Sequence, residues 1–126
     1  MSYPKVAVIG LGFMGRTHIQ TLRRLGVPIH GIAGIDENEG KKVAAELGIQ
    51  KWYTSFAEAI NDPEIEVVHL CTPNALHYEQ AKAALNAGKH VLCEKPLAMT
   101  FTQSRELAAL AQQKGLVTAV NYNLRF

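Results

Sequence analysis

The sequence predicts an α/β fold, with a doubly wound parallel sheet between two layers of helices in a three-layer αβα arrangement. Two observations support this prediction. Short apolar runs rich in Val and Ile alternate strictly with longer segments of helical period, and this alternation favours right-handed crossovers between parallel strands. Glycine follows four of the helical segments, where a left-handed residue commonly ends a helix: Gly26, Gly48, Gly88 and Gly115.

Six apolar runs are the expected strands. They cover residues 5–9, 29–35, 51–53, 67–71, 90–93 and 116–120, the third being short. We expect the Rossmann-like sheet order 3-2-1-4-5-6, in which ligands bind at the carboxyl ends of the strands. The expected helices lie at about residues 12–25, 39–47, 56–60, 75–87 and 101–114. Ser55 with Glu58 and Thr100 with Gln103 have capping-box spacing, and Asn74 can cap the fourth helix.

Composition narrows the class of protein. The 126 residues are 48% hydrophobic and carry a formal net charge of +2, with Lys and Arg scattered along the chain. We expect one globular domain over residues 1–126, with neither nucleic acid nor a membrane as its main partner. Because the start resembles no secretory signal, we expect a cytoplasmic location. Cys71 and Cys93 have no metal-site spacing and are expected to be buried, reduced thiols, and we expect no metal site.

The first strand end carries a glycine motif. Gly10, Gly12 and Gly15 form G-x-G-x-x-G between a strand and a helix. The first glycine permits a tight turn, the second lets a pyrophosphate approach the backbone, and the third lets helix and strand pack closely. The backbone amides of Phe13 and Met14 would then face the anion. The alternative is a glycine-rich turn without a ligand.

The second strand end carries an acidic residue. Asp36 follows Gly15 by 21 residues, and a carboxylate there can accept hydrogen bonds from the hydroxyls of an adenosine ribose while repelling a 2′-phosphate. Glu37 follows, and the next basic residue is Lys41. The site therefore favours NAD over NADP. The alternative is that Asp36 only begins the turn before a helix.

The fourth strand ends in Thr72, Pro73 and Asn74, and His77 falls in the first turn of the next helix. These side chains would lie beside the expected ligand site, although each residue type also serves as a cap or a turn residue. His69 lies inside the strand and is expected to be a packed or surface side chain, and His18 and His30 give no functional signal.

The fifth strand ends on a charged pair and a proline, Glu94, Lys95 and Pro96. An ammonium group beside a substrate hydroxyl can take part in proton transfer, and Glu94 can orient it through a hydrogen bond. Pro96 fixes the turn. The alternative is a surface ion pair, worth at most about 1 kcal/mol.

These motifs together resemble the N-terminal domain of the Gfo/Idh/MocA family of NAD(P)-dependent oxidoreductases. The similarity covers nearly the whole chain and rests on "VAVIGLGFMGRTH", the strand end at Asp36, "YTSFAEAINDPEIEVVHLCTPNALH", "ALNAGKHVLCEKPLAMT" and "VNYNLRF". It implies hydride transfer between NAD(P) and a hydroxyl or carbonyl carbon of a sugar, cyclitol or related polyol.

The resemblance also implies roles for single residues. The glycine loop would hold the pyrophosphate and Asp36 the adenine ribose, with the residues after the fourth strand lining the middle of the site. Glu94 and Lys95 would lie near the nicotinamide ribose, with Lys95 as the catalytic candidate, and Asn123 would approach the nicotinamide.

Proteins of this family continue into a second α/β domain that carries substrate contacts and, in many members, takes part in oligomers. We therefore expect a parent oxidoreductase that acts on a sugar-like small molecule and can form a homo-oligomer. We expect these 126 residues alone to bind the cofactor without turnover. Two alternatives are a non-catalytic module that senses NAD or serves as a scaffold, and a related fold that binds a flavin or S-adenosylmethionine.

Overall fold

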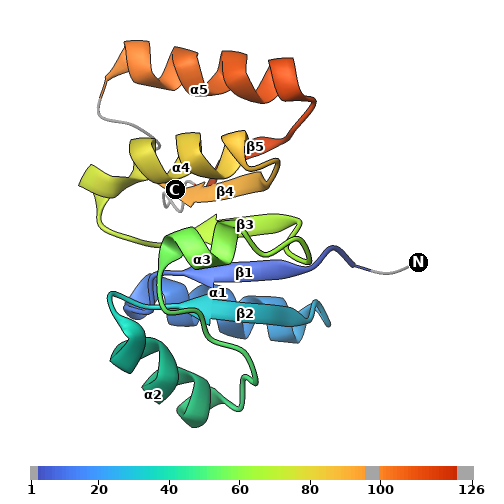
Figure 1. Cartoon of the computed structure of the whole chain (residues 1–126), viewed down its shortest axis with the longest axis vertical. Coiled ribbons are helices and arrows are strands. Elements are labelled where there is room, and N and C mark those ends of the chain that lie inside the picture. Colours follow the sequence, from blue (N-terminus) through green and yellow to red (C-terminus); the bar gives the residue numbers. More distant parts are fainter. Residues whose placement is uncertain (1–2, 96–99, 122–126) are drawn as a thin grey trace, which may run out of the picture.

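The computed structural model describes residues 3–95 and 100–121. Five parallel strands form one sheet in the order β2-β1-β3-β4-β5 (Figure 1). The strands are β1 (Val6–Ile9), β2 (Ile29–Ala33), β3 (Val67–Leu70), β4 (His90–Glu94) and β5 (Thr118–Asn121). This confirms the predicted α/β fold and five of the six expected strands in their expected order.

The expected third strand, residues 51–53, is reduced to one bridge between Trp52 and Ile32 at the β2 edge. The aromatic ring of Tyr53 explains why the pairing stops. Tyr53 is 2% exposed and packs so closely on β2 that a Cβ on Gly31 would lie 2.5 Å from its ring. Its hydroxyl donates to the Asp62 carboxylate at 2.6 Å. The chain is thereby anchored after a single bridge and turns into the next helix.

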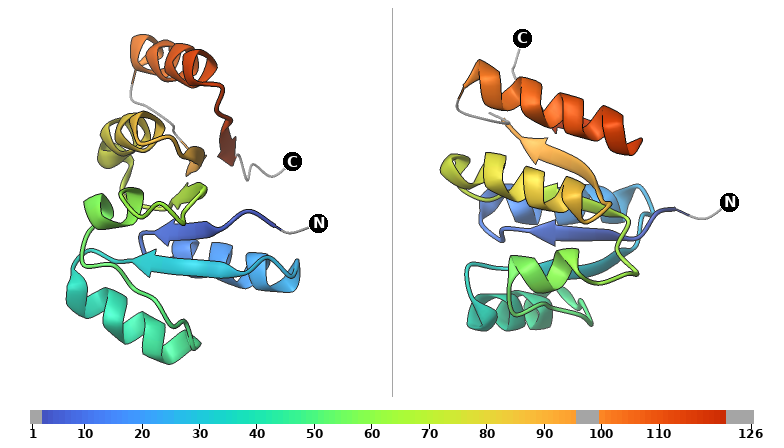
Figure 2. Two further views of the ribbon diagram at one scale, coloured as in Figure 1. Left: turned by 45° about the vertical axis from the view of Figure 1, so that its right-hand side comes forward. Right: turned by 45° about the horizontal axis from the view of Figure 1, so that its top comes forward.

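The helices between the strands are α1 (Phe13–Arg24), α2 (Glu37–Leu47), α3 (Phe56–Ile60), α4 (His77–Asn86) and α5 (Phe101–Lys114), with a 3₁₀ turn, η1 (Asn74–Leu76), before α4. One apolar cluster joins the sheet to α1 and α2, and a second joins it to α3, α4 and α5. Figure 2 shows these layers from two further directions. Strand β1 is buried on both faces, Val8 in one cluster and Ile9 in the other, as parallel central strands usually are.

Most of the predicted helix ends are confirmed. Ser55 Oγ accepts from the backbone N–H of Glu58, and Thr100 Oγ1 accepts from that of Gln103, both at 3.1 Å. The four glycines after helices all have positive φ. The predicted cap at Asn74 is wrong. Asn74 begins η1 instead, because the chain after Pro73 first makes a 3₁₀ turn, and no side-chain hydrogen bond caps α4.

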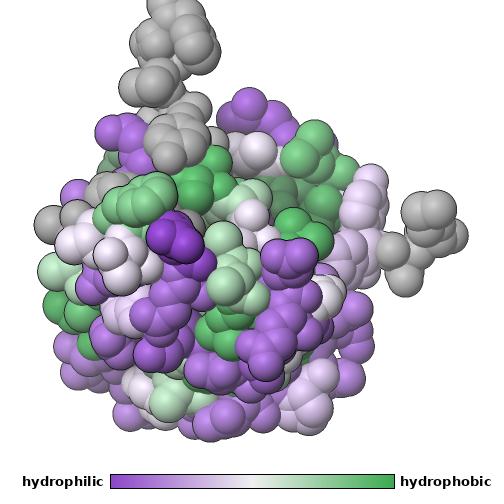
Figure 3. Space-filling model, turned by 90° about the horizontal axis from the view of Figure 1, so that it is seen from above, coloured by the Kyte–Doolittle hydropathy of each residue, from purple (hydrophilic) through white to green (hydrophobic). Residues whose placement is uncertain are grey.

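Seen from the α5 end, the surface mixes hydrophilic side chains with scattered apolar patches (Figure 3). Within the described residues, no helix is both long enough and apolar enough to cross a membrane.

Candidate functional site

A cavity of about 660 Å³ lies at the carboxyl ends of β1, β2 and β3, where parallel α/β sheets bind their ligands. Six of the residues singled out from the sequence line it: Gly10, Gly12, Phe13, Met14, Thr72 and Pro73. The loops after three separate strands therefore converge on one site, as the strand-end motifs predicted.

The three glycines of the first loop differ in what surrounds them. Gly10 has a φ of 95°, and a Cβ there would lie 2.6 Å from the backbone of Cys71. A Cβ on Gly15 would lie 1.8 Å from the carbonyl oxygen of Gly10, so α1 could not pack against the end of β1. A Cβ on Gly12 would meet no protein atom within 4 Å. The chain itself requires glycine at the first and third positions, whereas at Gly12 the open space faces the cavity.

The N-terminus of α1 also opens on this cavity. Gly12 is its N-cap, no side chain caps it, and its first turn contains no acidic residue. The first N–H groups of a helix have no carbonyl partner within the helix, and together with the helix dipole they form a site for an anion. The backbone here can therefore bind a phosphate or pyrophosphate group without a basic side chain.

Asp36 lies beside the cavity and caps α2. Its Oδ1 accepts from the backbone N–H of Glu39 at 2.9 Å, and a carboxylate of Glu39 in turn accepts from the backbone N–H of Ile35 at 2.8 Å. Ile35 and Glu39 line the cavity. The capping role considered from the sequence is thus present, and the exposed carboxylate of Asp36 retains capacity to accept further hydrogen bonds.

After β3, His77 lies beneath the loop and does not line the cavity. Its side chain is fully buried, and its Nε2 lies 2.7 Å from the carbonyl oxygen of Thr72. Because a carbonyl only accepts, Nε2 carries the proton, and His77 holds the loop from below. Thr72 Oγ1 donates to Gln80 Oε1 at 2.5 Å, while the exposed Asn74 lies outside the cavity lining.

At the end of β4, the two charged residues differ in burial. Glu94 is 8% exposed, and its Oε2 lies 2.6 Å from His18 Nε2, whereas Lys95 is exposed. Lys95 is the first residue after β4, and neither of the two charged residues lines the cavity. In the described part of the chain the ion-pair partner of Glu94 is therefore His18, not the expected Lys95. Pro96 and Asn123 lie outside the described residues.

His18 in turn contacts His69, and neither residue was expected from the sequence to have a functional role. Their Nδ1 atoms lie 2.9 Å apart. Burial, and to a lesser extent the nearby His18, lowers the pKa of His69 to about 4, so His69 is neutral at pH 7. The sequence did contain a signal for the burial of His18. Gly15, His18, Ile19 and Leu22 recur at the spacing of one helix face, and they form the buried face of α1.

Several cavity residues were also missed. Thr54, Ser55 and Phe56 follow the single bridge at residue 52, and Gln80 lies on α4. The first three could have been found from their position after the expected short strand at residues 51–53, because the loop after that strand reaches the same edge of the sheet as the other strand-end loops.

Both cysteines are free thiols, as expected. Cys71 lines the cavity, but burial raises the pKa of its thiol to about 12, and that of Cys93 likewise. Both thiols are protonated at neutral pH, which removes the thiolate that nucleophilic chemistry needs.

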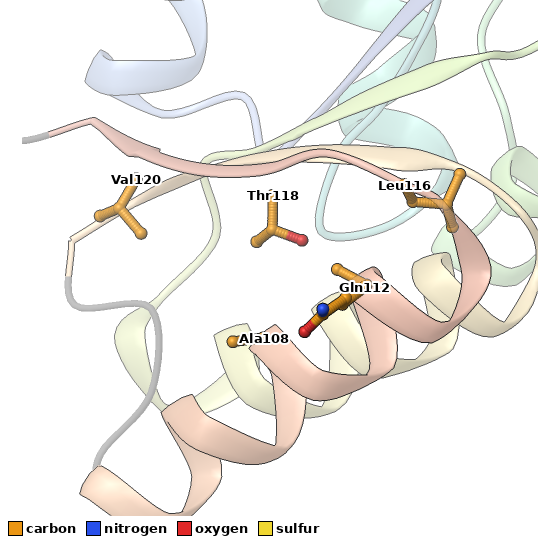
Figure 4. A pocket seen from close by; sticks show the side chains of 6 residues that line it. Ala108, Gln112, Leu116, Thr118 and Val120 are labelled. Carbon is orange, nitrogen blue, oxygen red and sulfur yellow. The ribbon is translucent and has the colours of Figure 1, made fainter.

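A second, smaller cavity of about 310 Å³ lies between α5 and β5 (Figure 4). Its lining is apolar apart from Gln112 and Thr118. It lies away from the glycine loop and carries no group suited to binding a phosphate, so the strand-end cavity is the candidate site.

The glycine loop, the open N-terminus of α1 and the acidic residue after β2 define a dinucleotide-binding domain of the Rossmann type. The chain belongs to the oxidoreductase family with an NAD-binding Rossmann fold, GFO_IDH_MocA, whose model matches residues 4–122. The resemblance found in the motifs is thereby confirmed.

Known relatives support this membership. The chain is 42% identical over 107 residues to 1,5-anhydro-D-fructose reductase of Ensifer adhaerens, a match that covers 85% of this chain and 32% of that protein. The structure of GenD2 from gentamicin A biosynthesis, in complex with NAD, superposes with a TM-score of 0.88 at 34% identity, covering 96% of this chain and 35% of GenD2.

A third similar protein was solved with a different cofactor. Biliverdin reductase from Synechocystis sp. PCC 6803, in complex with biliverdin and NADP⁺, superposes with a TM-score of 0.85 at 35% identity, covering 93% of this chain and 37% of that one. The chain thus spans about a third of the length of these proteins.

Proposed function

We propose that this chain binds NAD in the strand-end cavity as the cofactor domain of an oxidoreductase. The observation that carries the proposal is the surroundings of Gly12. A Cβ there would touch no protein atom, although Gly12 is the uncapped N-cap of α1 and lines the cavity. Its lack of a side chain therefore leaves room for a ligand, and the amides around it favour a pyrophosphate.

Asp36 would select the cofactor. Its exposed carboxylate would accept hydrogen bonds from the adenine ribose and repel the 2′-phosphate of NADP. Glu37, next along the chain, adds negative charge at the same helix start. Because the similar biliverdin reductase was solved with NADP⁺, titration with both cofactors is the direct test of this preference.

The nicotinamide cofactor, when bound, supplies the hydride chemistry. We assign proton transfer with the substrate to Lys95, which is exposed at the end of β4. The substrate we propose is a sugar, cyclitol or related polyol, which exchanges a hydride with the cofactor at a hydroxyl or carbonyl carbon. The similarity to a 1,5-anhydro-D-fructose reductase supports this substrate class. In this proposal a second domain completes a closed pocket, and the 126 residues alone bind cofactor without turnover.

Calorimetric titration of the chain with NAD, NADP, S-adenosylmethionine and FAD tests the binding step. We expect NAD to bind and NADP to bind at least about tenfold more weakly. A circular dichroism spectrum with helical content would show that the chain is folded. Failure of folded protein to bind NAD would overturn the proposal, and binding of FAD or S-adenosylmethionine in its place would assign another ligand.

The catalytic step needs the complete gene product, assayed with NAD against sugars and cyclitols. Lys95→Ala should lower kcat by about 100-fold or more, because a positioned proton donor or acceptor contributes that much. Lys114→Ala, at the far end of α5, is the matched control and should leave kcat unchanged. Equal turnover in the Lys95 variant and the wild type would remove the catalytic role. NAD binding without turnover of any such substrate would favour a sensing module.

A further inference from the structure

Three buried polar side chains form a continuous chain across the sheet. His69 on β3 contacts His18 on α1 at 2.9 Å, and His18 contacts Glu94 at the end of β4 at 2.6 Å. The three residues are only 7–8% exposed. The two imidazole rings are perpendicular, with centroids 5.2 Å apart, so each ring presents a nitrogen edge to its partner.

The protons in this chain can be assigned from its geometry. A carboxylate only accepts, so an ionised Glu94 requires the proton on His18 Nε2. The two Nδ1 atoms share one further proton, which lies on His69 if His18 is neutral and on His18 if it is an imidazolium. In both cases the Nε2–H of His18 donates to Glu94. That donation restrains the position of Glu94 Oε2.

The three residues also connect the two ends of the cofactor site. Helix α1 begins at the glycine loop, and His18 lies on its buried face. Glu94 directly precedes Lys95 at the end of β4. His69 and Glu94 project from the same face of the sheet, because His69 is in register with Leu92, two residues before Glu94. A contact between α1 and Glu94 therefore ties the pyrophosphate end of the site to the strand end that carries Lys95.

We propose that His18 is a positioning residue for the nicotinamide end of the cofactor site. By donating to Glu94 it holds the end of β4 so that Lys95 projects toward the cofactor and substrate, and His69 holds the ring of His18. This role rests on the proposed function, because it presumes that NAD lies in the strand-end cavity.

Two amide variants separate this role from simple packing. The side-chain nitrogen of Gln can take the place of imidazole Nε2, and that of Asn the place of Nδ1. His18→Gln can still donate to Glu94, whereas His18→Asn keeps a polar group near His69 and loses the donor to Glu94. A residue needed only to fill space would respond similarly to both changes.

The experiment is calorimetric titration of the 126-residue chain with NAD and with ADP, which lacks both the nicotinamide and its ribose. His18→Asn should weaken NAD binding by about tenfold and leave ADP binding within about twofold, and His18→Gln should keep NAD binding within about threefold of the wild type. His30→Asn, at the opposite end of β2, is the control and should change neither affinity.

Equal losses of affinity for NAD and ADP in His18→Asn, or equal losses for NAD in both His18 variants, would overturn the positioning role. If the wild-type chain binds neither ligand, the proposed function itself fails and this role with it. ¹⁵N NMR of the wild-type imidazoles supplies a test without any variant. We expect a proton on His18 Nε2 at pH 7, and a bare Nε2 would overturn the inference even if the variants did not fold.

Discussion

Helices α1 and α2 follow neighbouring strands of one sheet, yet their first turns are built in opposite ways. Asp36 caps α2 by accepting from the backbone N–H of Glu39, and the first turn of α2 contains Glu37 and Glu39. The first turn of α1 has glycine at the N-cap, no side-chain cap and no acidic residue. Side chains also cap α3 and α5.

The difference shows how the chain separates stability from binding. At α2 the protein's own carboxylates satisfy the amides and complement the helix dipole. At α1 the same groups are left for an anion from outside, at a cost in helix stability that an N-cap side chain would offset. The open N-terminus of α1 is thus the feature that a ligand completes, and three sets of variants test this difference between the two helices.

The largest effect is expected from Gly15→Ala. The new Cβ would lie 1.8 Å from the carbonyl oxygen of Gly10, so α1 must move away from β1. We expect the free energy of unfolding to fall by about 3 kcal/mol, even though Ala is favoured in a helix by about 1 kcal/mol. Urea denaturation measures this loss. Gly12→Ala is the matched control, because its Cβ meets open space. Equal losses in both variants would mean that packing does not distinguish the two glycines.

A second variant, Gly12→Asp, gives α1 the kind of start that α2 has. The added carboxylate should cap the helix and occupy the place of the pyrophosphate, so NAD affinity should fall by at least about tenfold, or 1.4 kcal/mol. Thermal unfolding without ligand should show unchanged or slightly higher stability. The helix N-terminus lowers the folded-state pKa of such a carboxyl, so any gain is present above about pH 4 and disappears as the pH falls further. Undiminished NAD binding would contradict an anion site at α1.

The smallest effect concerns the start of α2. Asp36→Ala should lower the free energy of unfolding by about 1 kcal/mol, because the cap to Glu39 is lost, whereas Asp36→Asn should stay within about 0.5 kcal/mol because Asn caps equally well. The Asn variant should nonetheless bind NADP more tightly relative to NAD, since the negative charge is gone. Titrations with both cofactors measure the ratio. If the ratio of NAD to NADP affinity is the same in the wild type and in Asp36→Asn, Asp36 caps the helix and does not select the cofactor.

Much of the fold could be predicted because its signals are local. Helix ends at Ser55, Thr100 and the four positive-φ glycines depend on residues within one turn of the chain. The strand at residues 51–53 was overpredicted, because its extent depends on how the Tyr53 ring packs against Gly31 of a distant strand. The turn after Pro73 was read as a direct cap at Asn74, since no short-range pattern distinguished a 3₁₀ start from an α-helical one.

The candidate site divides in the same way. Gly10, Gly12 and Gly15 could be assigned from spacing and context, because a tight turn, close backbone approach and helix packing follow from glycine at those three positions. The sequence was enough to single out Glu94 as a site residue, but not to identify His18 as its hydrogen-bonding partner. His18 is 76 residues from Glu94 in the sequence and His69 is 51 residues from His18, and only the crossover of α1 over the sheet brings them together.

The alternation of strands and helices, the glycine loop and the family can be recognised without a structure, because short-range patterns and residue types encode them. Which polar side chains meet depends on the folded arrangement of the chain. It buried His77 under the loop after β3, turned Glu94 inward to His18 and left Lys95 exposed. The physical reason is that a buried carboxylate or imidazole must find its hydrogen-bonding partner in space, and the fold, not the order of residues, sets which partners are within reach.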